Sequence, residues 1–535
     1  MKHYDYIIVG AGPAGCLLAN RLVTGKGARV LLLEAGPEDR GMFFRMPAGF
    51  LKYYTTNSFY WPYRAEQEEQ LGGKAARLQN GKVLGGGSSV NAMVYIRGNP
   101  RDFDAWAAMT GEAAWNGENA WATYRGLERN SLFGAPHHGV RGPLHVSPQA
   151  HTNELTLAFV AAAQEAGLPF NPDFNGDRQT GVGLYQLTTR THRRWSAVDA
   201  FIHPILGNPD FDLVTGAEVE RILLAGTRAV GVRYKKDGEV VEQRCDEEVI
   251  LSAGAIASPK LLMLSGIGPA EAVARHAIEP VVDLPGVGAN FIDHCEVPVA
   301  AYTRKRLGYY GVDKGMRSWL AGLQYLLFKT GPVASNGVEG GGFFHTDGED
   351  ADPNIQIFAV PGIYLDKDVT DISPGAGITL NACLVQPKSR GRVTLRSADP
   401  SDLPHIVTGF LSHQDDLDTM IKGVRRLREV FSCEPLKSLL SREVLPGTDV
   451  QDHDGLVAHI KRFVKTVYHP MGTCRMGRAD DPMAVVDPRL AVRGTEGLRV
   501  VDASVMPSPV SGNTVAATYM VAETAAKFIL PQKAY

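Results

Sequence analysis

Cysteine is scarce in this chain of 535 residues, and its six cysteines never occur as a Cys-x-x-Cys pair. This scarcity excludes the usual cysteine-based zinc sites and indicates free thiols in a reducing compartment. The net charge of -3 leaves no broad basic surface, which argues against nucleic acid as a partner.

Long apolar runs are also missing. No uninterrupted run could span a bilayer, and no charged leader with an apolar core precedes the first expected strand at Tyr4. We therefore expect a cytoplasmic protein, with peripheral membrane association left open but not indicated. No repeat or low-complexity tract occurs, and the length predicts two domains or one large composite domain.

The amino-terminal segment predicts a dinucleotide-binding unit. An apolar run over 4–9 leads directly into Gly10-x-Gly12-x-x-Gly15, a helical pattern follows, and a second apolar strand ends at Glu34. Gly10 allows the tight turn, Gly12 lets the backbone approach a pyrophosphate, and Gly15 lets the helix pack close to the strand. The helix N-terminus offers N–H groups to phosphates. Glu34 lies where a carboxylate binds an adenosine ribose, which favours FAD or NAD over NADP.

Two later segments are also punctuated by glycine. The segment "GKVLGGGSSVNAMVYIRG" (81–98) has three consecutive glycines, and these predict that something approaches the main chain closely. The segment "GAIASPKLLMLSGIGP" (254–269) predicts a short helix with Ser258 as its N-cap and Pro259 at its first position.

The carboxyl-terminal part contains one isolated histidine and one notable asparagine. His469 stands in "KTVYHPMGTCRMG" (465–477), where an imidazole is more often a packed, hydrogen-bonded core residue than a functional one. Over 498–530 the pattern predicts a strand that ends at Asp502, a loop that carries Asn513, and a closing helix.

Together these segments resemble the glucose-methanol-choline (GMC) family of FAD-dependent oxidoreductases, in its alcohol and choline dehydrogenase-like branch. The resemblance covers essentially the whole chain. Residues 81–104 match the first family signature and residues 254–268 match the second, while "YHPMGT" and "SGNTV" match the carboxyl-terminal pair. The resemblance implies that FAD, and not a diffusing nicotinamide, binds at the amino-terminal fingerprint.

The resemblance also assigns roles to His469 and Asn513. His469 would lie against the flavin as the catalytic base, because an imidazole that titrates near neutrality suits removal of a hydroxyl proton. Asn513 would donate to the substrate oxygen, although it could also cap the closing helix. The helix dipole at Thr514 would stabilise negative charge on the flavin. Some family members attach FAD covalently through a histidine where this chain has Val90, so we expect non-covalent FAD.

The resemblance further implies a set of residues that contact FAD. They are Gly10, Gly12, Pro13, Ala14, Gly15, Glu34, Ala35, Gly85, Gly86, Ser89, Asn91, Ala92, Met93, Val94, Val219, Ala253, Gly254, Asp502, Ala503, Asn513 and Thr514. Asn91 is expected close to flavin N5. Asp502 is expected near the ribityl and pyrophosphate groups, with a simple turn residue as the alternative.

The expected fold is an α/β composite, in which a Rossmann-like FAD-binding domain carries a substrate domain built on an antiparallel sheet. Strand-like runs at 354–360, 377–385 and 391–397 have no helices between them, which predicts antiparallel pairing. By resemblance, the FAD domain comprises 1–155, 201–305 and 463–535. The substrate domain then comprises 156–200 and 306–462.

The expected function is oxidation of a primary alcohol to an aldehyde, with dioxygen or another acceptor reoxidising the flavin. Aryl alcohols, heterocyclic alcohols such as pyridoxine, and long aliphatic or polyether alcohols are the candidate substrates. No carboxylate can be placed to bind a quaternary ammonium group, so choline is not favoured. The alternatives are a non-redox lyase of the same fold, similar to hydroxynitrile lyases, and a binding protein with structural FAD.

Several further features have both an ordinary and a functional interpretation. Candidate pocket residues are Tyr310, Phe358, Tyr364 and the cluster Tyr60 to Tyr63, although such aromatic residues are more often core. The apolar stripe at 317–329 is expected to pack in the core, with a lid or membrane-touching helix as the alternative. His137 and His138 are expected in an exposed loop, and no metal site is expected.

Overall fold

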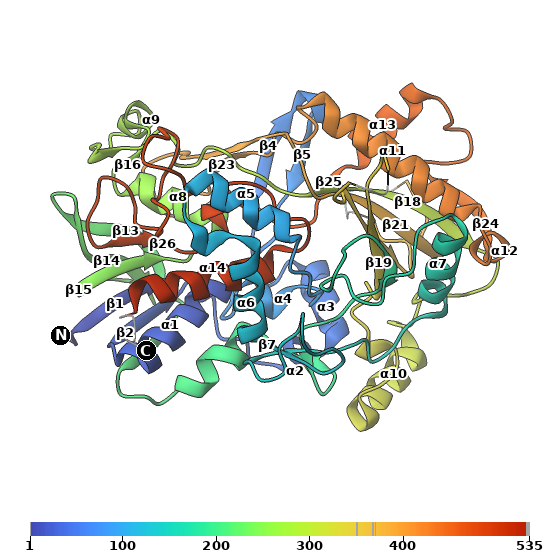
Figure 1. Ribbon diagram of the computed structural model, residues 1–535, viewed down its shortest axis with the longest axis horizontal. Helices are drawn as coiled ribbons and strands as arrows, with labels where there is room; N and C mark the ends of the chain where they lie inside the picture. Colours follow the sequence, from blue (N-terminus) through green and yellow to red (C-terminus); the bar gives the residue numbers. More distant parts are fainter. Residues whose placement is uncertain (1, 349–350, 366–368, 370, 531–535) are drawn as a thin grey trace.

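Two sheets organise the protein in the computed structural model, which describes residues 2–348, 351–365, 369 and 371–530 (Figure 1). The first sheet has seven strands in the order β12-β2-β1-β15-β14-β13, with β26 paired to β15. They are β1 (Tyr4–Val9), β2 (Val30–Glu34), β12 (Phe211–Thr215), β13 (Glu218–Ala225), β14 (Arg228–Lys236), β15 (Glu239–Leu251) and β26 (Leu498–Val500).

The central part of this sheet is parallel and fully covered. β1 pairs in parallel with β2 and β15, and every residue of β2 is buried. Such burial is expected where helices cover a parallel sheet, and it explains the uninterrupted apolar sequence of the strand. Helices α1 (Pro13–Lys26) and α14 (Thr514–Ile529) lie side by side against the sheet (Figure 1).

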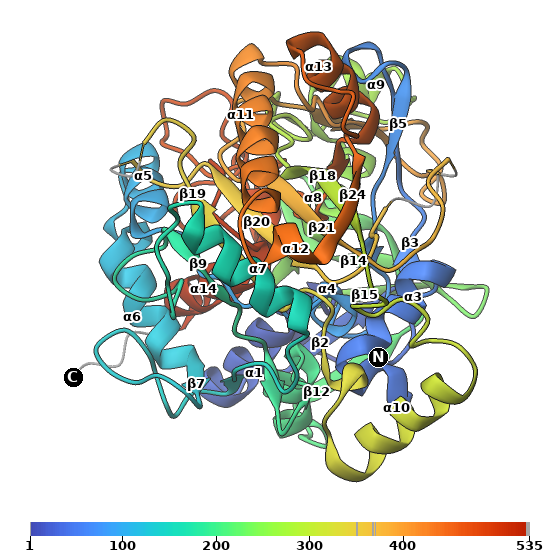
Figure 2. The same ribbon diagram turned by 90° about the vertical axis from the view of Figure 1, so that its right-hand side faces the viewer.

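The second sheet also has seven strands, in the order β24-β18-β21-β20-β19-β9, with β25 paired to β18. They are β9 (Gly181–Leu184), β18 (Cys295–Thr303), β19 (Gly340–Phe344), β20 (Ile355–Val360), β21 (Gly377–Leu384), β24 (Leu440–Leu445) and β25 (Lys465–Thr466). All of its pairings are antiparallel. Helices α7 (Glu154–Glu165) and α11 (Gln414–Phe431) cover its outer side (Figure 2).

The predicted composite of a parallel, Rossmann-like sheet and an antiparallel sheet is therefore confirmed. Each sheet has its own hydrophobic core. We retain the predicted domain division as a proposal, because the strands of the first sheet come from three separate stretches of sequence. Two strands that lie near the predicted boundaries of the FAD domain, β18 and β25, pair within the second sheet.

The run at 391–397 forms a strand but stays outside both large sheets. β22 (Arg392–Thr394) pairs only with β23 (His405–Val407) in a two-stranded sheet. The adjoining Gly391 exchanges two backbone hydrogen bonds with Phe291, at 2.8 and 3.0 Å. Because Phe291 occupies the backbone groups of Gly391, the run is held beside the Phe291 loop and does not join the second sheet.

The helix after β15 begins earlier than its sequence predicts. α8 spans Gly254–Leu264 with Pro259 in its interior, so the assignment of Ser258 as N-cap is wrong. Pro259 has no N–H to donate to the carbonyl of Ala255, and the hydroxyl of Thr473 donates to that carbonyl instead, at 2.6 Å. A partner distant in sequence therefore replaces the hydrogen bond that the interior proline cannot make.

Two other expectations about single segments are also wrong. The apolar residues of α10 (Gly315–Phe328) are mostly exposed, with only Ala321 and Tyr325 buried, so the stripe is not core. His138 is buried and not in an exposed loop, because its ring is held between Glu128 and Asp173 at 3.1 and 2.7 Å. Burial lowers the pKa of His138, but these carboxylates raise it further, above its ordinary value.

Candidate active site and cofactor cavity

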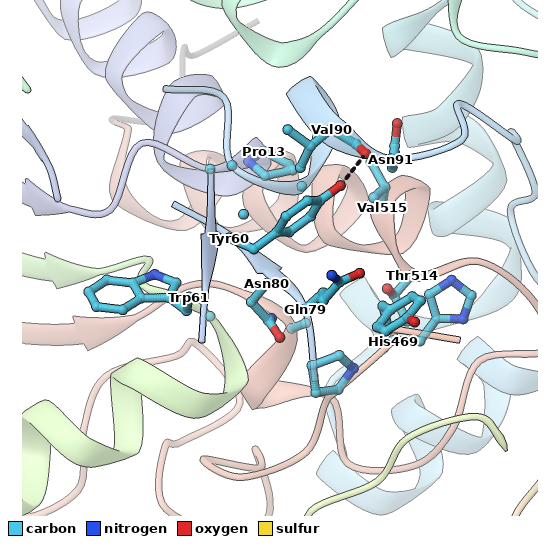
Figure 3. Close-up of a pocket in the computed structure, with 18 of the residues that line it drawn as sticks. Pro13, Tyr60, Trp61, Gln79, Asn80, Val90, Asn91, His469, Thr514 and Val515 are labelled. Atoms are coloured by element: carbon cyan, nitrogen blue, oxygen red, sulfur yellow. Dashed lines mark hydrogen bonds between the residues drawn. The ribbon is translucent and has the colours of Figure 1, made fainter. Parts of the chain in front are cut away.

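A cavity of about 470 Å³ lies between the two sheets. Its walls include the first glycine turn, the ends of β1 and β2, residues of β20 and β21, and the loop that carries His469. Figure 3 shows Pro13 and Tyr60 at one part of the cavity and His469 and Thr514 at another. The cavity therefore connects the predicted dinucleotide turn to the predicted catalytic residues.

The three glycines of the amino-terminal turn differ in what surrounds them. A Cβ added to Gly10, which has a φ of +98°, would lie 2.5 Å from the carbonyl oxygen of Ser252. A Cβ on Gly15 would lie 2.0 Å from the carbonyl oxygen of Gly10, so Gly15 allows α1 to approach β1. A Cβ on Gly12 would meet no atom within 4 Å, although Gly12 lines the cavity. The open space beside Gly12 fits a ligand that approaches the backbone.

Two buried carboxylates stabilise turns at this end of the cavity, Glu34 at the amino-terminal turn and Asp502 at the Gly254 turn. Glu34 accepts from the N–H groups of Ala11 and Gly36, at 2.9 and 2.8 Å, and burial raises its pKa to about 7. Asp502 accepts from the N–H of Gly254 at 2.8 Å and from the hydroxyl of Ser258 at 2.6 Å. Both residues line the cavity, where a carboxylate can accept further hydrogen bonds from ribose or ribityl hydroxyls.

Most of the residues predicted to contact FAD line the cavity, and three do not. Gly15, Gly85 and Ser89 lie outside the lining. A Cβ on Gly85 would lie 2.1 Å from the Oγ of Ser89, whose hydroxyl donates to the carbonyl of Leu84. These three residues shape the turns behind the wall.

His469 lies on a loop after β25, and its backbone is fixed by a buried acid. Its N–H donates to Asp293 at 2.9 Å. The imidazole contacts Asn513 through Nε2, at 3.2 Å, and His294 through Nδ1, at 3.0 Å. Burial, followed by the influence of His294, lowers the pKa of His469 well below its ordinary value of 6.5, so the ring is neutral near pH 7.

A chain of hydrogen bonds determines how the side chain of Asn513 is oriented. The hydroxyl of Tyr185 must donate to the carbonyl of Ile357, at 2.6 Å, so its oxygen accepts from the amide of Gln356 at 3.3 Å. The same Gln356 amide reaches Asn513 Oδ1 at 3.4 Å. Asn513 Nδ2 therefore points at His469 and donates to Nε2.

This polarity also selects the tautomer of His469. Because Nε2 accepts from Asn513, the proton of the neutral ring is on Nδ1 and is donated to His294 Nδ1. His294 is fully buried, and burial lowers its pKa to about 4, so it accepts this bond as a neutral ring. The unprotonated Nε2 of His469 is the atom that can act as a base.

Asn513 occupies the N-cap position of α14 but does not cap the helix. Its side chain makes no hydrogen bond to the first turn and turns toward Gln356 and His469 instead. An asparagine at an N-cap ordinarily bonds the helix N–H groups. The side chain of Asn513 therefore bonds Gln356 and His469 in place of the N–H groups of the helix.

The aromatic predictions divide between the cavity and the surface. Phe358 and Tyr364 line the cavity, as do Tyr60, Trp61 and Tyr63, whereas Tyr310 does not and is 37% exposed. The adjacent Tyr309 lines the cavity instead, because its hydroxyl donates to the buried Glu339 and directs the ring inward. Sequence spacing did not distinguish these two neighbouring tyrosines.

A buried ion pair that the sequence did not reveal borders the His469 end. Lys465 Nζ lies 3.0 Å from a carboxylate oxygen of Glu296 and 3.8 Å from the ring centroid of Tyr364. Glu296 and Tyr364 line the cavity. Burial lowers the pKa of Lys465, but Tyr364 and Glu296 raise it more, above its ordinary value, so Lys465 is cationic beside the carboxyl group of Glu296.

Comparison with known proteins agrees with this arrangement. Sequence profiles of the GMC oxidoreductase family match residues 4–296 and 387–522. This chain belongs to the GMC oxidoreductase family. FAD is the cofactor typical of GMC oxidoreductases, and the open space at Gly12 together with the carboxylates of Glu34 and Asp502 fits it.

Individual GMC oxidoreductases are similar over nearly their whole length. The chain is 43% identical to the alcohol dehydrogenase [acceptor] of Pseudomonas putida, over 98% of this chain and 96% of that protein. It is 39% identical to the mitochondrial choline dehydrogenase of Mus musculus, over 98% and 89%. The crystal structure of pyridoxine 4-oxidase from Mesorbium loti superimposes with a TM-score of 0.89 at 30% identity, covering 98% of this chain and 99% of that one.

Proposed function

We propose that this GMC oxidoreductase oxidises the primary alcohol group of a neutral substrate to an aldehyde. The observation that carries the proposal is the contact between Asn513 Nδ2 and the unprotonated Nε2 of His469 in the cavity wall. A substrate hydroxyl that reaches both atoms from the cavity can donate to Nε2 and accept from Nδ2 at the same time. Similarity to an alcohol dehydrogenase and to a pyridoxine oxidase supports this reaction class.

The two residues then have complementary tasks. His469 Nε2 receives the hydroxyl proton, while Asn513 Nδ2 donates to the oxygen and stabilises the charge that develops there. His294 accepts a hydrogen bond from the Nδ1–H of His469 and keeps the ring in position. When bound, FAD supplies the two-electron acceptor for the hydride that leaves the carbinol carbon. Dioxygen or another acceptor takes up the electrons afterwards.

The substrate that fits this end of the cavity is uncharged. Its lining near His469 is largely aromatic and aliphatic, including Tyr54, Phe358 and Tyr364, and the carboxylate of Glu296 is neutralised by Lys465. A quaternary ammonium group would find no uncompensated anion at this pair. Aryl, pyridoxine-like, or long aliphatic or polyether alcohols therefore remain our proposed substrates, and choline is disfavoured.

We infer that FAD is held non-covalently, because the buried side chain of Val90, which lines the cavity, has no group that can form a bond. Acid precipitation should therefore release all the flavin into the supernatant. In Gly12→Ala the added Cβ enters the ligand space without a clash in the protein, so released flavin per chain should fall at least several-fold. Gly126→Ala, also without a neighbour within 4 Å, should release the wild-type amount. Yellow colour in the pellet would contradict non-covalent binding.

Replacement of His469 tests the proposed reaction. His469→Ala should slow anaerobic flavin reduction by a panel of alcohols by roughly two to four orders of magnitude, the usual effect of a lost general base. Its flavin content should remain that of the wild type. Unchanged reduction kinetics would remove His469 from its role, whereas an oxidised spectrum with every alcohol in the wild-type protein would favour the non-redox, lyase-like alternative.

The lowered pKa of His469 predicts the pH dependence of the reductive step. The base acts in its neutral form, so the rate should be constant above pH 6.5 and should decline only in acid. His294 contributes to the lowering, and His294→Phe should therefore move the acid decline toward pH 6.5. His459→Phe replaces another buried histidine, with a pKa near 4, and should leave the profile unchanged. A wild-type rate that rises steeply between pH 7 and pH 9 would refute a neutral base at rest.

The ion pair at the pocket provides a test of substrate charge. Lys465→Met leaves the carboxylate of Glu296 without its cation, so kcat/KM for choline relative to a neutral alcohol should rise about ten-fold or more. In Lys465→Met/Glu296→Gln both charges are absent, and the gain for choline should disappear. An equal gain in both variants would show that space, and not charge, controls selection.

A further inference from the structure

Helix α10 presents an apolar face that the described part of the chain leaves open to solvent. Its large apolar residues that are more than a third exposed are Met316, Trp319, Leu320, Leu323, Leu326, Leu327 and Phe328, with Met316 at 70% and Phe328 at 69%. The helix is attached mainly through Tyr325, which packs with Met46 and Ala334. Figure 2 shows α10 projecting from the lower edge of the molecule. A contiguous row of exposed large apolar residues on a protein surface marks a contact surface.

The charge of the surrounding segment is opposite to that of the whole protein. Residues 304–329 contain six lysines and arginines and a single acid, Asp313, whereas the full chain has 55 basic and 58 acidic residues. None of these six cations forms an ion pair with any residue that the structure describes. A short helix with bulky apolar residues and flanking cations is typical of segments that lie in the surface of an anionic bilayer.

The helix cannot cross a bilayer. Its 14 residues span about 21 Å, against an apolar thickness of about 30 Å. Among the described residues, no helix is long and apolar enough to be a membrane span. The apolar face can therefore enter the interface only sideways.

The position of α10 connects this face to the cavity. The chain leaves the cavity wall at Tyr309, forms α10, and returns to the wall at Asn336. The 3-10 turn after α10, η6 (Pro332–Ala334), packs against η1 (Pro47–Gly49), which leads into α3 (Phe50–Thr56). Leu51 on α3 lines the cavity and is 40% exposed, so the cavity opens beside α10.

We propose that α10 docks this protein on the surface of an anionic lipid bilayer and thereby places the mouth of the cavity at the lipid. The apolar face enters the acyl boundary while Lys314, Arg317 and their basic neighbours meet the lipid phosphates. A second copy of the chain is the less suitable occupant, because pairing two such faces would bring two cationic segments together. The proposal is independent of the reaction assigned to His469.

Flotation of the FAD-loaded protein with lipid vesicles tests the proposal. The protein should float with vesicles made of equal parts phosphatidylglycerol and phosphatidylcholine, and much less with phosphatidylcholine alone. Trp319→Ser should weaken binding by about ten-fold or more. Val240→Ser alters a residue that is 50% exposed on the β14–β15 hairpin, which lies at the opposite end of Figure 1, and should bind as the wild type does.

The cationic contribution has its own matched pair. Lys314→Gln/Arg317→Gln should weaken binding by about five-fold for each charge removed, whereas Lys235→Gln/Arg244→Gln should have little effect. All four variants should retain bound flavin and turnover of a water-soluble alcohol. Absence of flotation with the anionic vesicles, or equal binding by the α10 and hairpin variants, would overturn the proposal. Dimerisation that Trp319→Ser abolishes, without vesicle binding, would replace the bilayer with a second copy.

Discussion

The proposed chemistry depends on a buried imidazole whose hydrogen-bond partners are all neutral. Asn513 and His294 fix the ring of His469 from its two nitrogens, and no carboxylate contacts the ring among the described residues. A carboxylate there would favour the charged form before any substrate arrived. With neutral partners, burial keeps Nε2 unprotonated, and the polarity of the site is set by a distant backbone carbonyl, that of Ile357.

Local sequence patterns predicted the parts of this site that a short segment determines by itself. The spacing of Gly10, Gly12 and Gly15 specifies a turn, a ligand approach and a close helix contact. In the structure Gly10 and Gly15 lie against backbone carbonyls, and Gly12 faces open space. The strand that ends at Glu34 and the antiparallel runs of the second sheet followed from apolar periodicity. These features depend on backbone sterics and burial that are nearly independent of the rest of the chain.

Pairs formed across long separations could not be predicted in the same way. His294 and His469 are 175 positions apart, and Lys465 meets Glu296 only because β25 pairs with β18. Sequence shows that such residues exist but not which of them will be neighbours. The predictions that the α10 stripe is core and that His138 is exposed were wrong for a related reason. Sequence identifies an apolar face or a polar residue but not whether another element covers it.

The hydroxyl of Thr473 has a consequence beyond the local repair of α8. It lies four residues after His469 and bonds the carbonyl that Pro259 leaves free in the helix behind the Gly254 turn. This hydrogen bond connects the loop that carries His469 to the helix at the cofactor end of the cavity. This bond is made within the protein alone, so the spacing between the base and the cofactor end of the cavity is supported without help from substrate or FAD.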